Sequence, residues 1–376
     1  MKIAIVNHDF SLGGVQRVAI TIADGLAEIE DYSVYLISFS GIDNFYYSVS
    51  EKCKIIINPA KRKFSENLKF RLAAKRYKIS EKEMLISKIY KNQLRGLISI
   101  LKDENFDCVI LCQSDLTALA SKIKTAVPKI KVIGWQHSDY EIYFTNTEYA
   151  KLFLDEYVKG LEVADEVVCL AKNYQTKFRR HNKNTVFIYN PVTLDVNKIS
   201  KLNTLNIIFV GRLVMENKGL DLLLDVIEQA PQNWNWILAG DGKDRNQLES
   251  LILKKQLTSK IKLVGALNKD NLIKHYESGS VFVSTSRWEG FGLSIIEAMS
   301  FGLPIVAFDI PGVREALDDG RCGILIEKYD ILLFYQAVER LMDDYELRMH
   351  YQNLSLERVK CFTLKKILPE WRKIIE

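Results

Sequence analysis

The chain of 376 residues contains no long hydrophobic run. No apolar stretch approaches the ~20 residues that a helix needs to span a bilayer. The opening strand, Lys2 to Val6, runs into polar His8 and Asp9, without the apolar region and small-residue cleavage site of a signal peptide. We therefore expect a cytoplasmic protein without a transmembrane segment.

Cysteine is also scarce, with six residues and no Cys-x-x-Cys pair. Cys108 and Cys112 bracket an apolar run, a position typical of buried free thiols. No Asp-x-Asp sequence is present either. These absences argue against a disulfide framework and against the commonest metal motif, and we expect neither a cofactor nor a metal.

The remaining composition is ordinary for a globular protein, with 48% hydrophobic and 26% charged residues. The net charge of +5 is unevenly distributed. Residues 61–102 hold 13 Lys and Arg against three acidic residues, so this segment carries +10 and the rest of the chain −5. A basic block in an otherwise acidic protein indicates an anionic partner.

Short apolar runs alternate with helical patterns along the whole chain, which predicts βαβ units and parallel sheets. Two consecutive series predict an α/β protein with two doubly wound, Rossmann-like domains, divided at the polar stretch 191–205. Helices are expected at Met84–Leu101 and Tyr149–Val163, among other places, and at the amphipathic segment Leu364–Ile375. The expected strands are Lys2–Val6, Val34–Ser38, Lys54–Ile57, Cys108–Leu111, Lys131–Trp135, Glu166–Cys169, Val186–Ile188, Asn206–Val210, Trp236–Ala239, Ile261–Val264, Val281–Ser284, Ile305–Ala307 and Gly323–Ile326.

The most informative stretch runs from Arg287 to Val306. Glu289 and Glu297 lie eight residues apart across a turn in which Gly290 and Gly292 allow the backbone to approach a ligand closely. A helix is expected from Leu293, and its N-terminal N–H groups attract phosphate. Two carboxylates that bind hydroxyl groups, beside a phosphate-binding helix end, indicate a nucleotide-sugar site. A strand, a turn and a helix with two solvated glutamates is the alternative.

The same stretch resembles the E-G-F-G-L-x-x-x-E-A-M signature of glycosyltransferase family 4, whose members are retaining enzymes with the GT-B fold. The resemblance implies an acceptor-binding domain at 1–190, a linker at 191–205, a nucleotide-sugar-binding domain at 206–360 and a C-terminal helix at 361–376 that returns to the first domain. It implies donor contacts from the glutamate motif at Glu289, Gly290, Phe291, Gly292, Leu293 and Glu297.

Arg212 and Lys218 follow the strand Asn206–Val210, where two cations can neutralise a departing diphosphate. The resemblance assigns this role to the matching Arg and Lys. The spacing of six between them is one residue longer than the commoner pattern, because Asn217 is additional. Two solvated cations are the alternative interpretation.

Three further places are implied by the resemblance. Gly13 and Gly14 precede a helix, whose N-terminus can accept an anion. Gly240 lies in the turn after Trp236–Ala239, and the backbone near Val264 is expected to meet the base of the nucleotide. Glycines that serve only turn geometry are the alternative for Gly13, Gly14 and Gly240.

His137 ends the apolar stretch that begins at Val132 and runs through Gln136, and the carboxyl end of a strand faces the ligand in open α/β sheets. Family members often carry a histidine at the corresponding place. The expected role is to orient the donor sugar or to relay the acceptor proton, and a structural histidine is the alternative. His8 has no comparable context in the sequence and is expected to be structural or solvated.

The basic block contains apolar residues at helical spacing, among them Leu68 and Leu72, which predicts a basic amphipathic helix suited to an anionic membrane surface. A merely solubilising face is the alternative, and no nucleic-acid-binding fold accompanies the charges. The cations expected to face the membrane or the acceptor are Arg62, Lys63, Lys69, Arg71, Lys75 and Arg76.

Together these observations predict a hexosyltransferase that needs no metal and is peripheral on the inner face of the membrane. Its expected substrates are a nucleotide sugar, with UDP favoured as the nucleotide, and a lipid-linked or surface-glycan acceptor. Two other classes stay open: a non-catalytic GT-B subunit of a glycosyltransferase complex, and a GT-B epimerase or phosphorylase that acts on soluble sugars.

Overall fold

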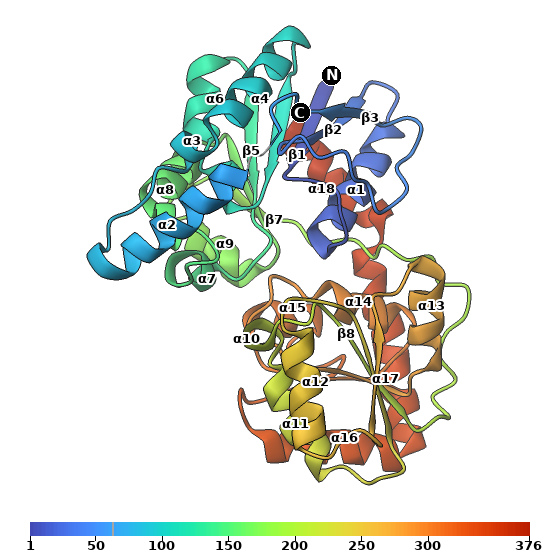
Figure 1. The fold of residues 1–376 in the computed structure, drawn as a ribbon. Coiled ribbons are helices and arrows are strands. Elements are labelled where there is room, and N and C mark those ends of the chain that lie inside the picture. Colours follow the sequence, from blue (N-terminus) through green and yellow to red (C-terminus); the bar gives the residue numbers. More distant parts are fainter. Residues whose placement is uncertain (62–63) are drawn as a thin grey trace. The chain divides into compact units, whose positions relative to one another are not determined.

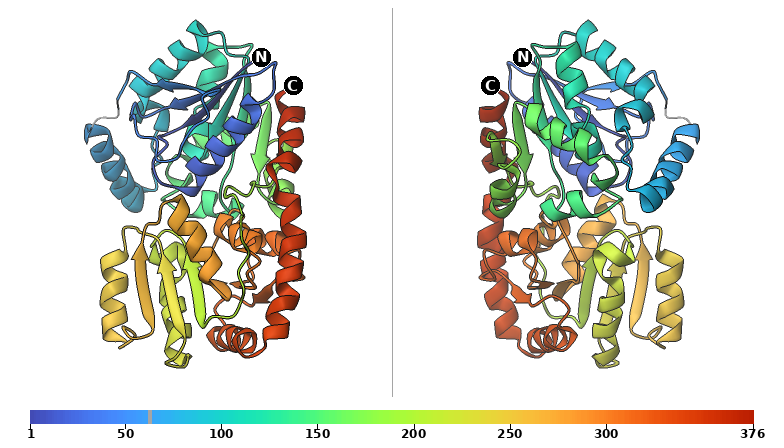
Figure 2. Two further views of the ribbon diagram at one scale, coloured as in Figure 1. Left: turned by 90° about the vertical axis from the view of Figure 1, so that its right-hand side faces the viewer. Right: turned by 90° about the vertical axis from the view of Figure 1, so that its left-hand side faces the viewer.

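The computed structural model describes residues 1–61 and 64–376, and it divides into two compact units. Unit 1 comprises Met1–Pro191 and Leu364–Glu376, and unit 2 comprises Val192–Thr363. Each unit has a parallel sheet with helices on both faces (Figures 1 and 2). The prediction of two doubly wound α/β domains is confirmed. No helix in the described part of the chain combines the length and hydropathy that crossing a membrane requires.

Unit 1 contains a seven-stranded sheet in the order β3-β2-β1-β4-β5-β6-β7. The strand order reverses between β1 and β4, which makes this point the topological switch point of the sheet. Near-continuous apolar strands form because both faces of a parallel sheet are covered. The strands are β1 (Lys2–Asn7), β2 (Ser33–Ser38), β3 (Lys54–Ile57), β4 (Cys108–Cys112), β5 (Lys131–Trp135), β6 (Glu166–Cys169) and β7 (Thr185–Phe187).

The helices of unit 1 cover this sheet and include the last helix of the chain. Two predicted helices are interrupted. Met84–Leu101 is divided at Tyr90, and Tyr149–Val163 begins as a 3-10 turn at Lys151–Phe153. The helices are α1 (Gly14–Ala27), α2 (Phe64–Ser80), α3 (Ile86–Ile89), α4 (Lys91–Asp103), α5 (Ser114–Thr117), α6 (Ala120–Ala126), α7 (Tyr140–Thr145), α8 (Leu154–Val163), α9 (Lys172–Phe178) and α18 (Leu364–Ile375).

Unit 2 contains a six-stranded sheet in the order β10-β9-β8-β11-β12-β13. Its strands are β8 (Asn206–Val210), β9 (Asn235–Ala239), β10 (Ile261–Gly265), β11 (Val281–Ser284), β12 (Ile305–Phe308) and β13 (Ile324–Ile326). Its helices are α10 (Met215–Lys218), α11 (Leu220–Gln229), α12 (Arg245–Lys254), α13 (Lys269–Ser278), α14 (Leu293–Ser300), α15 (Pro311–Ala316), α16 (Ile331–Asp343) and α17 (Tyr345–Arg358), followed by a 3-10 turn at Val359–Phe362.

Helix α18 belongs to unit 1 although it ends the chain, and it lies beside α1 (Figure 1). Gly25 of α1 allows this approach, since a Cβ there would lie 2.8 Å from Leu368 Cδ1. Trp371 is fully buried and meets Trp135 edge to face, with ring centroids 4.6 Å apart. The C-terminal helix therefore completes the core of unit 1.

We predict that Trp371→Ala lowers the free energy of unfolding by about 3–5 kcal/mol, as expected for removing a fully buried aromatic side chain. Urea titration followed by circular dichroism measures the change. Lys373→Ala, an exposed position in the same helix, is the matched control and should be close to neutral. Equal effects of the two substitutions would contradict the packing role of α18.

Candidate functional site

The turns after β8, β9 and β10 form a close-packed backbone layer at the carboxyl edge of the unit 2 sheet. Gly240 has a φ of +142°, and a Cβ there would lie 1.8 Å from the Gly211 carbonyl oxygen. Its N–H donates to the Gly265 carbonyl at 2.8 Å. Only glycine fits at Gly240, so the predicted turn has a steric reason of its own. Val264 lies where the register between β10 and β9 is irregular.

Arg212 extends from this layer into solvent. It is exposed, and its guanidinium makes no hydrogen bond or ion pair with the described residues. The backbone around it is fixed, because the Leu213 N–H donates to the Asp241 carbonyl at 2.9 Å. A cation without a side-chain partner among the described residues therefore lies at the carboxyl end of β8.

Lys218 and Glu289 form an ion pair although they are 71 positions apart in the chain. Their side chains are 14% and 15% exposed. Ser286 Oγ donates to the same carboxylate oxygen, Glu289 Oε1, at 2.8 Å. The sequence-predicted cation and the first glutamate of the motif are thus brought together beside the strand ends.

Asn217, the additional residue between Arg212 and Lys218, holds these two loops together. Its Nδ2 donates to the Trp288 carbonyl at 2.9 Å, and its own carbonyl accepts the Arg287 N–H at 2.8 Å. Although the spacing between Arg212 and Lys218 is one residue longer than in the commoner pattern, Lys218 still pairs with Glu289.

A second ion pair, which sequence reasoning missed, holds the loop that carries Glu289. Arg287 donates to both carboxylate oxygens of Asp221, at 2.9 and 2.6 Å. Burial alone would raise the pKa of Asp221, but the hydrogen bonds and charge of Arg287 lower it below the ordinary value. Such bidentate pairs fix geometry strongly. The only sequence signal was Arg287 two residues before Glu289.

Glu297 is placed differently from the ligand-facing carboxylate that the motif suggested. It is fully buried, and its two oxygens accept from Thr193 Oγ1 at 2.6 Å and Tyr276 OH at 3.0 Å. The reason is that α14 is surrounded by protein along this stretch, since positions 295 to 300 are all buried. In this conformation Glu297 holds the segment around Thr193 rather than presenting itself to a ligand.

The start of α14 keeps the features expected of an anion-binding helix end. Gly292 precedes the helix with a φ of +77°, and among the described residues no side chain caps the first turn. Leu293 is partly exposed there.

Phe291 instead turns inward and packs edge to face on Phe362, with centroids 5.2 Å apart. Gly290 is buried against Gly312, where a Cβ would lie 2.6 Å from the Gly290 carbonyl oxygen.

In unit 1, the glycine pair lies at the start of α1. Gly13 precedes the helix and Gly14 is its first residue, without a capping side chain among the described residues. A Cβ on Gly13 would lie 2.2 Å from Gln16 Oε1, so the Gln16 amide folds back over the glycine. The turn is close-packed, and its use by an anion stays a prediction.

His137 follows β5 and is held in a largely apolar setting. Its backbone N–H donates to Tyr143 OH at 2.8 Å, and its ring lies 4.4 Å from the Trp135 ring. Its Nε2 is shielded from solvent and has no partner among the described residues. Burial lowers the pKa of His137 to about 3, so the imidazole is neutral at neutral pH.

The structure also shows a histidine–aspartate pair that sequence reasoning did not find. His8 Nε2 and Asp115 Oδ2 form a close hydrogen bond after β1 and β4, the two strands at the switch point. His8 was expected to be structural or solvated, and its side chain is 17% exposed and paired, so it is not solvated. A separation of 107 positions left no local sequence signal.

Helix α2 carries five cations of the basic block, Lys69, Arg71, Lys75, Arg76 and Lys78, and Arg62 and Lys63 lie outside the described residues. Its inner face, including Phe70 and Tyr77, packs on the core of unit 1. Its outer face exposes Leu68, Leu72 and Ile79, at 50%, 56% and 88%. The apolar residues therefore occupy two opposite faces rather than one stripe. The described cations Lys69, Arg71, Lys75 and Arg76 are all exposed.

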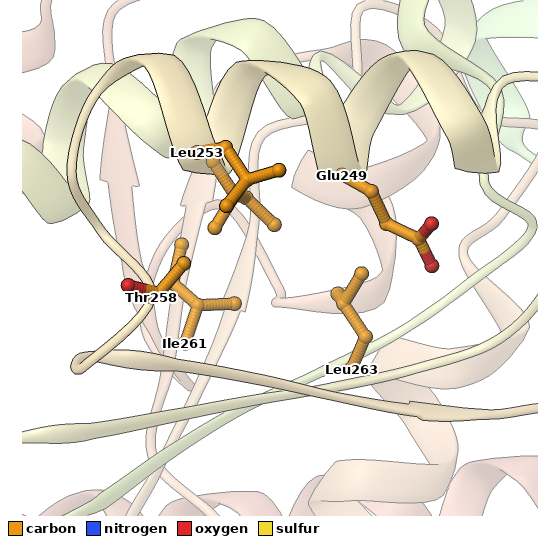
Figure 3. Close-up of a pocket in the computed structure, with 6 residues that line it drawn as sticks. Glu249, Leu253, Thr258, Ile261 and Leu263 are labelled. Carbon is orange, nitrogen blue, oxygen red and sulfur yellow. The ribbon is translucent and has the colours of Figure 1, made fainter.

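A separate groove of about 210 Å³ lies between α12 and the edge strand β10. Leu253, Ile261 and Leu263 line it, and their side chains face one another (Figure 3). Glu249 is its charged member and pairs with Arg245. The groove shares no residue with the glycine and glutamate turns, and its apolar lining does not suit a diphosphate.

Known proteins resemble this chain in sequence. Residues 195–356 match the family described as glycosyl transferases group 1. The chain is 29% identical to an uncharacterized glycosyltransferase of Haemophilus influenzae over 97% of both chains. It is 24% identical to a Campylobacter jejuni α-1,4-N-acetyl-D-galactosaminyltransferase that acts on an undecaprenol diphosphate-linked glycan, covering 100% of this chain and 98% of the relative.

Solved structures of other proteins share the fold of this chain. Sucrose-phosphate synthase of Thermosynechococcus elongatus aligns with a TM-score of 0.81 at 18% identity, over 99% of this chain and 98% of the other. Staphylococcus aureus TarM, solved with UDP, aligns with a TM-score of 0.77 at 17% identity, over 100% and 99%. The predicted GT-B fold and the resemblance to glycosyltransferases are therefore confirmed.

We predict that His137 makes stability depend on pH. Between pH 7 and 5 the unfolded chain protonates this histidine, whose ordinary pKa is 6.5, while the folded chain with a pKa of about 3 does not. Stability is thus lost as the pH falls, by about 2 kcal/mol at pH 5 from this one group. His137→Gln should remove that part of the pH dependence in urea titrations.

The exposed His350 supplies the control, since His350→Gln should keep the full pH dependence. An identical loss of stability between pH 7 and 5 in His137→Gln and in the unmodified protein would show that this imidazole is not held neutral.

Proposed function

We propose that this chain, whose residues 195–356 carry the group 1 glycosyl transferase sequence, moves a hexosyl or N-acetylhexosaminyl group from a UDP-sugar to a lipid-linked or surface-glycan acceptor. The transfer retains the configuration of the sugar. The observation that carries the proposal is the Lys218–Glu289 pair at the carboxyl edge of the unit 2 sheet, with exposed Arg212 in the neighbouring turn.

A sugar diphosphate needs a cation and a hydroxyl acceptor close together, because its phosphates are anionic and its sugar is neutral. Lys218 and Glu289 supply this combination, and a donor would share both groups. Glu289 accepts from sugar hydroxyls, while Lys218 and Arg212 neutralise the diphosphate with charge-assisted hydrogen bonds. The N–H groups at the start of α14 add partial positive charge.

The same groups stabilise the transition state. Negative charge grows on the diphosphate as the bond to the sugar breaks, and fixed cations are most effective where charge develops. Arg212 and Lys218 thereby take the role that a metal has in other transferases, in keeping with the absence of an Asp-x-Asp sequence. His137, as a neutral imidazole, is proposed to orient the donor sugar.

The names of relatives support the substrate classes. One full-length relative is an Erwinia amylovora glycosyltransferase of amylovoran biosynthesis, 24% identical over 96% of both chains. The Campylobacter jejuni relative named above acts on a lipid-linked glycan. These names support a role in the synthesis of a bacterial type of surface polysaccharide, with a lipid-linked or surface-glycan acceptor.

Helix α2 supports attachment to an anionic membrane. Its outer face places the exposed apolar residues Leu68, Leu72 and Ile79 between exposed cations. This arrangement suits a helix that lies in the interface with its apolar residues among the lipids and its cations at the headgroups. A peripheral location on the inner face of the membrane would bring unit 1 to its acceptor.

The donor site is tested by a thermal-shift panel of UDP-, GDP- and ADP-sugars. A ligand that binds the native state raises its apparent stability, and we expect UDP-sugars to give the largest shift. We predict that Arg212→Ala weakens UDP-sugar binding by about 10–100-fold, since a hydrogen bond to a charged group contributes about 1.5–3 kcal/mol.

Arg321→Ala is the matched control. Arg321 is an exposed arginine of unit 2 that pairs with Asp318 and lies just before β13, at the opposite edge of the sheet. It should leave the UDP-sugar affinity unchanged. No shift with any sugar nucleotide, or equal affinities of both arginine variants, would contradict the proposed donor site.

Membrane attachment is tested by flotation with vesicles of phosphatidylcholine, with and without phosphatidylglycerol. We predict binding to the anionic vesicles and at least a tenfold loss in Lys75→Glu/Arg76→Glu, because each cation near such a surface contributes about 1 kcal/mol. Lys365→Glu/Lys366→Glu changes an exposed pair of unit 1 outside α2 and should bind normally. Equal recovery with and without phosphatidylglycerol would rule the attachment out.

A further inference from the structure

His8 lies at the position in unit 1 where an open α/β sheet binds its ligand. It follows β1, and Asp115 follows β4, so the pair spans the two strands at the topological switch point. Ligands of doubly wound sheets bind beyond the carboxyl ends of the strands at this point. Neither the glycine turn nor the glutamate motif includes these residues.

The imidazole of His8 is held on three sides. Its ring meets Phe39 at 5.7 Å and Tyr90 at 5.5 Å between centroids, both edge to face, and Phe39 and Tyr90 meet each other at 5.5 Å. Asp115 forms the third side, and Tyr90 OH also donates to Asp115 Oδ2 at 3.4 Å. The ring orientation is therefore fixed before any ligand arrives.

The pairing with Asp115 also fixes which ring nitrogen carries a proton. Burial by itself would raise the pKa of Asp115. The charge and the hydrogen bond of His8 outweigh this effect and lower the pKa of Asp115, so the carboxylate is ionised and can only accept hydrogen bonds. Nε2 of His8 must then be the donor. The other ring nitrogen, Nδ1, is shielded from solvent and has no hydrogen-bond partner among the described residues.

The surrounding backbone is strained and polar. Gln113 has φ +79° and ψ 167°, a region that residues other than glycine avoid at a cost of about 1–3 kcal/mol and that is typical of functional sites. Asn7 is fully buried, and its Oδ1 accepts from the His8 N–H at 2.9 Å and from Gln113 Nε2 at 3.3 Å. Its own Nδ2 has no partner in the described part of the chain.

We propose that His8 is an acceptor-binding residue: its Nδ1 forms a hydrogen bond with a hydroxyl group of the acceptor sugar, and Asp115 positions the ring for this contact. The inference rests on the proposed transferase function and adds a specific polar contact for the acceptor. A sugar hydroxyl fits because it can both donate and accept a hydrogen bond, whereas an ionised phosphate only accepts.

A purely structural role for the pair makes the opposite prediction for two substitutions. His8→Gln keeps an N–H near the position of Nε2, and thus the bond to Asp115, but removes Nδ1. His8→Asn keeps a polar atom near the position of Nδ1 but cannot reach Asp115. A substrate role makes His8→Gln the more harmful change for transfer, and a structural role makes His8→Asn the more harmful change.

The first experiment measures binding to the unmodified full chain. Ring ¹⁵N-labelled histidine reports the five imidazoles by NMR, and His8→Gln identifies the His8 signals. The probes are the n-octyl β-glycosides of glucose, galactose and N-acetylglucosamine. We expect the Nδ1 signal of His8 to shift with at least one glycoside, while Nε2 keeps its proton. His8 signals that none of the three glycosides moves would overturn the proposal.

The second experiment measures rates with UDP-glucose, UDP-galactose, UDP-N-acetylglucosamine and UDP-N-acetylgalactosamine, with and without the same glycosides. We expect His8→Gln to raise the KM for the glycoside at least tenfold, with donor hydrolysis and Tm unchanged. His350→Gln should match the unmodified protein. A His8→Gln variant with normal transfer, beside a His8→Asn variant with a lowered Tm, would establish a structural role instead.

The two proposals fail separately. An unmodified chain that neither binds nor hydrolyses any UDP-sugar contradicts the proposed function, whereas the NMR titration still decides whether His8 meets a sugar hydroxyl. A chain that hydrolyses UDP-sugar but leaves the His8 signals unmoved contradicts only the assignment of His8.

Discussion

Parallel strand pairing is the constraint on which both units depend. All strands of a parallel sheet end at the same edge, so turns that are distant in sequence meet there. In unit 2 this brings Gly211, Gly240 and Gly265 into backbone contact and sets Lys218 against Glu289. In unit 1 it sets His8 against Asp115. Each polar grouping exists because two strands stop side by side.

Burial then decides which side chains at these edges can meet a ligand. The carboxylate of Glu289 is partly exposed. Glu297, eight residues later, is buried in the core, and its carboxylate accepts hydrogen bonds from Thr193 and Tyr276. His137 is held neutral by its apolar surroundings, while His8 is polarised by a carboxylate. The same residue types therefore have different chemistry according to their packing.

The strands and the two-domain architecture were predictable from the sequence, because buried parallel strands are continuous apolar runs. The break at Tyr90 was not, since the apolar periodicity continues through it, while the backbone leaves the helical conformation there with φ −90° and ψ 23°. In the site, local spacing predicted the glutamate turn and Arg212. It could not predict the burial of Glu297, which depends on how unit 2 packs around α14, or the pairing of His8 with Asp115, which depends on strand order. Asn217 looked like an interruption and instead joins two loops.

The central claim is that the diphosphate of a UDP-sugar lies at the carboxyl edge of the unit 2 sheet, between the cations and the start of α14. A crystal structure of the protein with a bound UDP-sugar tests this most directly. The account predicts phosphate oxygens within hydrogen-bond distance of Arg212, Lys218 and the first N–H groups of α14, with Glu289 on a sugar hydroxyl. A nucleotide bound elsewhere, such as in the groove between α12 and β10, with the Lys218–Glu289 pair undisturbed, would contradict it.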